Sequence, residues 1–104
     1  DFLTTTTYLP VNPTEFNWLH IENTIKLGKQ ISQGKPLYVF AWPQYAGGIG
    51  YMGATDWTRQ LNLTRQLADG VIVWGSYQLP GADQQWNPNS AWWTTFTNWL
   101  TINR

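Results

Sequence analysis

The chain has 104 residues, no cysteine, one histidine and a formal net charge of zero, from six basic and six acidic residues. These counts exclude disulfide bonds, thiolate metal sites and a histidine-rich metal centre within the chain. A neutral chain also lacks the basic field that nucleic acid or an anionic membrane requires, so we expect neither as a partner.

Three short stretches predict β-strands, near residues 2–8, 37–42 and 71–75. The first has high β-propensity because of its four threonines, and Pro10 ends it. The second lies between Pro36 and Pro43, and the third stops at Gly75. The last two are apolar without alternation, which is typical of strands buried on both faces in a parallel sheet.

Helices are predicted near residues 13–33, 56–69 and 91–102. We expect the first to begin with Asn12 as its N-cap, Pro13 at the first helical position and Glu15 completing a capping box. Gly34 and Gly70 are expected to end the first two helices. Apolar stripes at helical spacing support all three: Trp18, Ile21, Ile25, Leu27, Gly28 and Ile31; then Trp57, Leu61, Thr64 and Ala68; then Trp92, Trp93, Phe96, Trp99 and Leu100.

The alternation of strands and helices predicts parallel strands joined by right-handed crossovers. Tyr8 and Trp42 are 34 positions apart, and Trp42 and Trp74 are 32 apart. One βα unit every 33 residues or so matches a barrel of about 250 residues with eight units. The predicted fold is therefore α/β, with three consecutive βα units that form the last three of a TIM (β/α)₈ barrel. The whole chain, 1–104, is expected to be the C-terminal portion of a single barrel domain whose N-terminal units lie outside this sequence.

Three units alone leave two strand edges and one face of the sheet open. We therefore expect the remaining barrel segment, or a partner chain, to complete the sheet. A further alternative is an independent chain that completes the sheet by self-association.

Active-site groups of such barrels lie at the C-terminal ends of the strands and in the loops that follow. Here those positions are Thr6, Thr7 and Tyr8, then Trp42, Gln44 and Tyr45, then Trp74, Ser76 and Tyr77. Aromatic rings stack on the apolar face of a sugar, while amides and hydroxyls bind its rim. An aromatic content of 16% beside a charged content of 12% suits such a neutral ligand. We predict a polysaccharide or glycan as the ligand, bound by Tyr8, Trp42, Gln44, Tyr45, Trp74 and Tyr77.

Other residues allow simpler interpretations. The tryptophans within the helical stripes are interpreted as packing residues, and Trp74 has plain barrel filling as its alternative. Trp86 either holds its long loop in place or forms a sugar platform, and His20 is interpreted as a surface or packing residue. The glycine-rich segment 46–53 lacks the spacing of a phosphate-binding loop, so we expect a loop over the site and no cofactor.

Glycoside hydrolysis usually needs two carboxyl groups, or one together with an acetamido group of the substrate. Four of the six acids fall at helix starts, in helices or in turns, and Asp1 opens the first strand. Only Asp83, in the last loop, is positioned by the sequence to reach the site, and its alternative is loop solvation. No catalytic pair and no metal site is therefore predicted within this chain.

Three segments carry a family resemblance: Thr6-Thr7-Tyr8-Leu9, Lys35-Pro36-Leu37-Tyr38-Val39-Phe40 and Gly70-Val71-Ile72-Val73-Trp74-Gly75-Ser76. In this order and spacing they resemble the C-terminal part of hyaluronidase-like and related glycoside hydrolase barrels. Chitinase-like barrels also end with a tryptophan on the final strand. The resemblance implies that Tyr8 and Trp74 line the sugar subsite next to the cleaved bond, and that the catalytic carboxylates lie on an earlier strand. The chain departs from the hyaluronidase pattern in having no cysteine and in Pro43-Gln44-Tyr45 after the second strand.

The expected function is that of a carbohydrate-active barrel, a glycoside hydrolase whose catalytic carboxylates lie outside this segment. The alternative is a non-catalytic barrel that binds glycans or serves as a structural subunit. An extracellular or secretory location is expected for either role.

Overall fold

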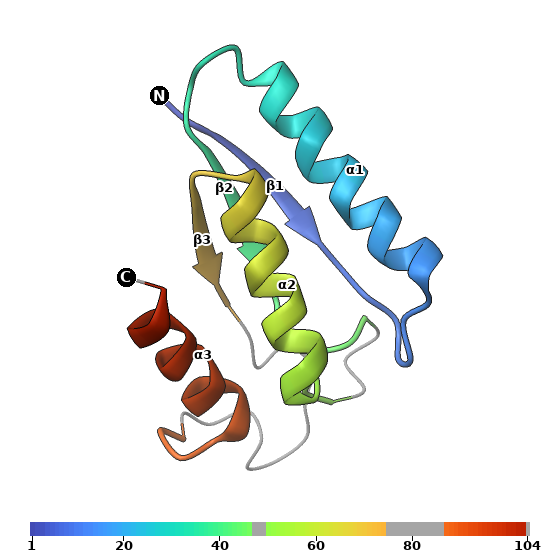
Figure 1. Cartoon of the computed structure of the whole chain (residues 1–104), viewed down its shortest axis with the longest axis vertical. Coiled ribbons are helices and arrows are strands. Elements are labelled where there is room, and N and C mark those ends of the chain that lie inside the picture. The colour runs from blue at the N-terminus through green and yellow to red at the C-terminus, as the bar shows by residue number, and fades with distance from the viewer. Residues whose placement is uncertain (47–49, 75–86, 104) are drawn as a thin grey trace.

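The computed structural model describes residues 1–46, 50–74 and 87–103. Within them, three parallel strands form one sheet in the order β1-β2-β3 and alternate with three helices (Figure 1). The elements are β1 (Leu3–Thr7), α1 (Glu15–Ile31), β2 (Leu37–Ala41), α2 (Ala54–Leu67), β3 (Gly70–Val73) and α3 (Ala91–Ile102). The predicted α/β class and the alternation of parallel βα units are confirmed, with strand ends within two residues of the prediction.

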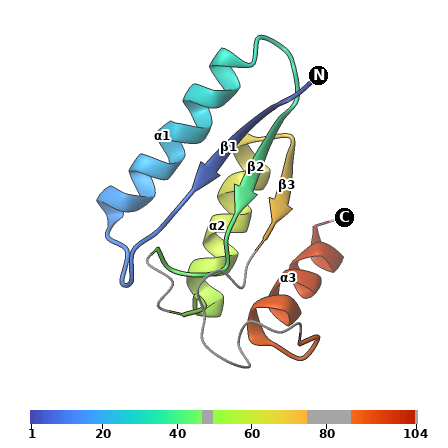
Figure 2. The ribbon, with the colours of Figure 1, turned by 180° about the vertical axis from the view of Figure 1, so that it is seen from behind.

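The described helices all lie on one side of the sheet, as the two opposite views show (Figures 1 and 2). On this side Leu37, Val39 and Ala41 of β2 are fully buried under α1 and α2. Successive side chains of a strand point to opposite faces, so Tyr38, Phe40 and Ile72 lie on the other face. No described helix covers that open face, which carries the aromatic and aliphatic side chains of β2 and β3 together with Thr4 and Thr6 of β1.

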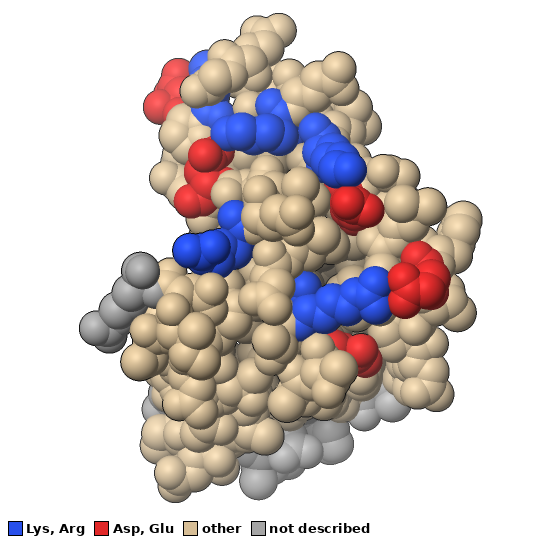
Figure 3. Space-filling model, in the orientation of Figure 1, with Lys and Arg blue, Asp and Glu red and all other residues tan. Residues whose placement is uncertain are grey.

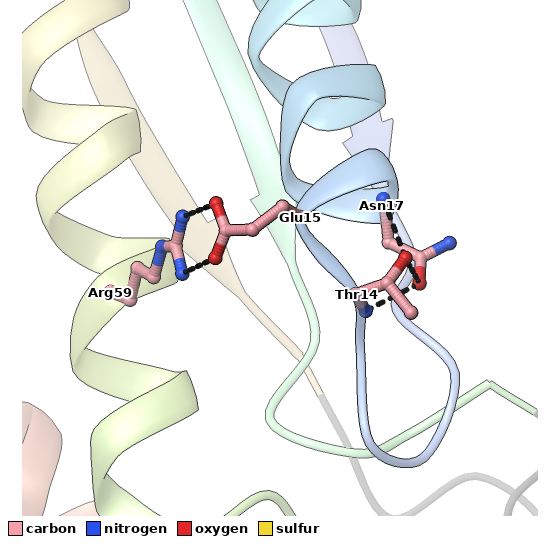
Figure 4. A network of polar contacts seen from close by, with 4 residues as sticks. All are labelled: Thr14, Glu15, Asn17 and Arg59. Carbon is pink, nitrogen blue, oxygen red and sulfur yellow. Dashed lines mark hydrogen bonds and ion pairs between the residues drawn. The ribbon is translucent and has the colours of Figure 1, made fainter.

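The start of α1 differs from the prediction. Thr14, not Asn12, is the N-cap, and Thr14 and Asn17 form a reciprocal capping box (Figure 4). Asn12 has a positive φ of 54°, a left-handed conformation that asparagine tolerates better than most residues. Glu15 consequently becomes the first helical residue, and its carboxylate is free to bind elsewhere.

The apolar stripe of α1 is narrower than predicted. Trp18, Ile21 and Ile25 are buried against the sheet and α2, as expected. Leu27 and Ile31 are 56% and 59% exposed, so their predicted place in the inward stripe is wrong. They project from the flank of α1 beside the outer edge of β1.

Trp57, Leu61 and Thr64 are buried on the inner face of α2, which confirms three of the predicted positions. The prediction that Gly70 ends this helix is wrong, because α2 ends at Leu67 and Gly70 is the first residue of β3. A Cβ atom on Gly70 would lie 2.7 Å from the ring of Tyr38, so only glycine fits beside that ring.

Helix α3 packs against α2. The indole Nε1 of Trp57 donates to the carbonyl of Trp92 at 3.1 Å, and Nε1 of Trp99 donates to Oδ1 of Asn62 at 2.8 Å. Trp92, Phe96 and Trp99 contact the core and remain partly exposed. Ser90 lies at the N-cap of α3, and its side chain makes no capping hydrogen bond.

Candidate functional site

Tyr8, Trp42 and Trp74 form a continuous row of rings at the C-terminal edge of the sheet. Thr6, Phe40 and Ile72 are register partners on the three strands, and the row lies two residues further along each chain. The row therefore continues the open face of the sheet. The rings of Tyr8 and Trp42 meet edge to face with centroids 5.5 Å apart, and those of Trp42 and Trp74 stack at 5.1 Å with an interplanar angle of 6°.

The three rings differ in how much a ligand can reach them. Tyr8 is 49% exposed and Trp74 is half-buried, whereas Trp42 is only 5% exposed. Trp42 lies between the other two and fixes their spacing. A ligand on this edge would therefore contact Tyr8 and Trp74, with Trp42 acting as a support.

The segment after β2 folds back beside the row. Gln44 and Tyr51 form an antiparallel bridge, and the backbone N–H of Tyr45 donates to the carbonyl of Gly50 at 3.0 Å. The N–H of Ala46 donates to the carbonyl of Leu9 at 2.7 Å, which ties this segment to the end of β1. Gln44 is fully buried, so its side chain belongs to the framework of the loop and does not face solvent.

Tyr45 brings a carboxylate to the same edge. Its hydroxyl donates to Oδ2 of Asp56, in the first turn of α2, at 2.9 Å. Burial, and then the hydrogen bond to the Asp56 carboxylate, raise the pKa of Tyr45, which therefore remains a neutral phenol. The sequence placed Asp56 only at a helix start and gave no sign of this contact.

A buried hydrogen bond next to the row joins the last residue of β1 to α2. Nε2 of Gln60 donates to Oγ1 of Thr7 at 2.5 Å, and both side chains are buried. Gln60 was not predicted as a site or core residue, because glutamine in a helix is usually exposed. Gln60 follows Trp57 by three residues and precedes Thr64 by four, and this spacing places it on the same helix face as those two buried residues.

The remaining described acids do not form a catalytic pair with Asp56. Asp69 binds Nζ of Lys29 at 2.5 Å and the backbone N–H of Leu37 at 2.8 Å, at the opposite edge of the sheet where β2 begins. These two contacts hold the pKa of Asp69 below its ordinary value. Glu22 pairs with Lys26 on the surface of α1.

Glu15 forms a bidentate pair with Arg59, with oxygen–nitrogen distances of 3.0 and 2.9 Å (Figure 4). The guanidinium group lies 4.4 Å from the ring centroid of Trp18. Hydrogen bonding to Arg59, and then its charge, lower the pKa of Glu15. This cluster fastens α1 to α2 on the helix side of the sheet.

Four predicted site residues are therefore placed at one edge of the sheet: Tyr8, Trp42 and Trp74 in the row, and Tyr45 beside Asp56. Gln44 lies at this edge but is buried. Tyr77, like Ser76, Asp83 and Trp86, lies outside the described residues. Within the described ranges, no three metal-ligating side chains gather, and no helix has the length and hydropathy to cross a membrane.

Comparisons with protein-family models, with curated proteins and with solved structures found no match to this chain.

Proposed function

We propose that the chain forms three consecutive units of a (β/α)₈ barrel and that its strand-end edge binds a saccharide. The observation that carries the proposal is the row of Tyr8, Trp42 and Trp74, which continues the face of the sheet that no described helix covers. A (β/α)₈ barrel turns such a face inward and binds its ligands at the C-terminal ends of its strands. Such a protein would act outside the cell or in the secretory pathway.

The protein is a glycoside hydrolase if the other units of the barrel supply an acidic pair. Asp56 is an acid at the same edge as the row, and its carboxylate accepts the hydrogen bond of the Tyr45 hydroxyl. One carboxylate is not enough for the usual two-carboxylate mechanisms. The alternative is a glycan-binding barrel without catalysis, which would keep the row and lack the pair. Release of reducing ends from a polysaccharide by the whole source polypeptide would indicate the glycoside hydrolase. Binding without such release would indicate the non-catalytic barrel.

Truncation of the two accessible rings tests saccharide binding. We expect Tyr8→Ala and Trp74→Ala each to weaken the affinity for an oligosaccharide by about fivefold or more, since stacked aromatic contacts are worth roughly 1 kcal/mol or more. Phe2→Ala is the control, because Phe2 is an exposed ring beside Tyr38, towards the opposite end of the strands. Unchanged binding in the two test variants, measured by calorimetry, would refute the proposal.

A further barrel unit beside β1 is part of the same proposal. The outer flank of α1 carries Phe16, His20, Thr24, Leu27 and Ile31 at intervals of four, four, three and four residues, and all its large apolar side chains are more than half exposed. A groove of about 310 Å³ runs between this flank and β1, lined by Leu3, Thr5, Thr24, Leu27, Ile31 and Leu37. The flank of α1 that faces α2 is charged, with Glu15 and Glu22. An apolar outer flank suits a second neighbouring helix, whose strand would pair with β1.

Cysteine labelling tests this surface, because the chain contains no cysteine of its own. In the whole source polypeptide, we expect the thiol of Ile31→Cys to be protected from a maleimide. Ile102→Cys is the control, since Ile102 is 81% exposed at the end of α3. Equal labelling of both thiols would contradict a neighbouring unit. A disulfide between two copies through position 31 would indicate self-association instead.

A further inference from the structure

Helix α2 contains the acceptor pattern for an N-linked glycan, which is an asparagine followed two positions later by a serine or threonine. The pattern here is Asn62-Leu63-Thr64. Enzymes that attach such glycans act in the secretory pathway, so the inference rests on the location given under the proposed function. We infer that Asn62 is a glycosylation site and that its glycan stands on the outer surface of α2.

The acceptor side chain lies on the solvent side of α2. Gln60 and Thr64 are buried, and a residue two positions from either lies about 200° around the helix. Asn62 is accordingly exposed. Its Oδ1 accepts the indole N–H of Trp99 at 2.8 Å, and no described residue bonds to its Nδ2. The nitrogen that would carry the glycan is therefore available, and attachment there leaves the bond to α3 intact.

The surface beside Asn62 has space for sugars. A groove of about 370 Å³ lies between α1 and α2, and Asn62 lines it together with Trp18 and Gln66. A second hollow, of about 460 Å³, extends from Asn62 along the first half of α2. In the view of Figures 1 and 3, from the helix side of the sheet, no described segment lies in front of the middle of α2.

Completion of the proposed barrel would leave this surface exposed. Helix α2 contacts α1 on one flank and α3 on the other, so both of its neighbours belong to this chain. Further units would join the sheet at β1 and β3, which are its two outer strands. Asn62 also lies about two turns from the start of α2, away from the edge where the aromatic row lies. A glycan at this position would therefore obstruct neither barrel closure nor saccharide binding.

The hydroxyl group of Thr64 is not explained by the packing of α2. The side chain is 2% exposed, and its Oγ1 has no hydrogen-bond partner among the described residues. A buried hydroxyl without a partner is unfavourable, and a valine would fill the same space without that penalty. The acceptor pattern, in contrast, requires a hydroxyl at this position. Glycan attachment therefore accounts for a group that the folded helix does not use.

Attachment precedes the folding of α2. Side chains two positions apart do not face each other on a helix, so an enzyme that recognises both Asn62 and Thr64 acts on the unfolded chain. The co-reactant is an oligosaccharide linked to a lipid diphosphate. Nδ2 forms a bond to the anomeric carbon of the first N-acetylglucosamine as the bond from that carbon to the diphosphate breaks. The lipid diphosphate leaves with the bonding electrons, and the amide nitrogen loses one proton.

Peptide mapping of the whole source polypeptide, isolated from its native source, tests the inference. Trypsin cleaves after Arg59 and Arg65 and releases peptide 60–65, in which Asn62 is the only asparagine. Peptide-N-glycosidase in heavy-oxygen water converts a glycosylated asparagine to an aspartate that holds one heavy oxygen. We expect the unmodified peptide to be the minor form before treatment and the heavy aspartate peptide to appear afterwards.

An unmodified peptide 60–65 as the main form would overturn the inference. Calorimetry with an oligosaccharide on the same preparation keeps this failure separate from that of the proposed function. Binding that persists with an unmodified peptide would overturn the glycosylation site alone. A glycosylated peptide in a preparation that binds no oligosaccharide would support the glycosylation site and count against the proposed saccharide binding.

Two variants at Thr64 provide a second test in the whole polypeptide produced by a secretory host. Thr64→Ser keeps the hydroxyl and should keep the glycan on peptide 60–65. Thr64→Val has the shape of threonine without the hydroxyl and should abolish the glycan, while its urea midpoint stays equal to that of the wild type or rises. A heavy aspartate peptide from Thr64→Val, or none from the wild type, would overturn the inference.

Discussion

The hydrogen bond between Gln60 and Thr7 gives the sharpest test of how α2 is fixed to the sheet. The donor–acceptor distance is 2.5 Å, and both side chains are buried. Thr7→Val keeps the shape and β-propensity of the side chain and removes only the hydroxyl group, whose oxygen accepts the hydrogen bond from Gln60. The Gln60 amide would then be left without this partner in the core, where an unsatisfied polar group costs about 1–3 kcal/mol.

Removing the Gln60 side of this hydrogen bond is expected to lower the free energy of unfolding by less. Oε1 of Gln60 is itself buried without a hydrogen-bond partner among the described residues, so Gln60→Leu relieves one unfavourable contact while breaking another. We expect a loss of about 1 kcal/mol for Gln60→Leu and about 2 kcal/mol for Thr7→Val. The double variant should lie within about 0.5 kcal/mol of the wild type, because apolar groups of similar shape then face each other.

Urea denaturation of the four proteins measures this cycle, and a loss of 1 kcal/mol corresponds to a fall of roughly 4–8 °C in melting temperature. Thr6→Val is the control, since Thr6 is exposed on the opposite face of the same strand, and it should change stability by less than about 0.5 kcal/mol. Additive losses in the double variant would show that the two side chains are not coupled. That result would refute the assignment of this bond as the contact between α2 and β1.

Three further outcomes follow from the packing and the charges. Gly70→Ala should destabilise the protein by about 1–3 kcal/mol in urea, because its Cβ would lie 2.7 Å from the Tyr38 ring. This loss of stability should disappear in a Tyr38→Ser background, and its persistence there would contradict the steric cause. Trp57→Ala should cost about 3–5 kcal/mol, since it removes a fully buried ring and the hydrogen bond to α3, and a native urea midpoint would exclude this anchoring role. Because the pKa of Tyr45 is raised in the folded state, the stability it contributes is present below its ordinary value of 10.0 and is lost as pH rises above it. Asp56→Asn should reduce that alkaline loss of stability and should lower the pKa of Tyr45 in an absorbance titration. The pKa should not fall fully to its ordinary value, because burial is the larger cause of the shift. An unchanged pKa would show that the carboxylate does not act on this phenol.

The order of elements was predictable because each has a strong local pattern. Leu37–Ala41 is a short apolar run between prolines, and Trp57, Leu61 and Thr64 repeat at helical spacing. The positions of the aromatic row followed from the rule that parallel strands end at a common edge. Local patterns could not show which face of each strand or helix is buried, or which other element buries it.

The start of α1 shows why a sequence motif can be misassigned. Asn12 with Glu15 fits the usual capping box, which has glutamate or glutamine at its third position. The structure uses Thr14 with Asn17, a less common pair, while Asn12 takes a left-handed turn conformation. Glu15 pairs instead with Arg59, which is 44 positions away and invisible to a local pattern.

The open face of the sheet does not have the composition usual for a solvated face. Strands with one solvated face normally alternate apolar and polar residues, as antiparallel sheets do. Here β2 and β3 are apolar on both faces, although the described helices cover only one. A free-standing three-stranded layer would therefore leave Tyr38, Phe40 and Ile72 without packing partners on the uncovered side. Their burial would require further protein segments on that side. A closed barrel supplies that burial with side chains of its own strands, and it would place Tyr8 and Trp74 at the mouth of the barrel, where a saccharide can reach them.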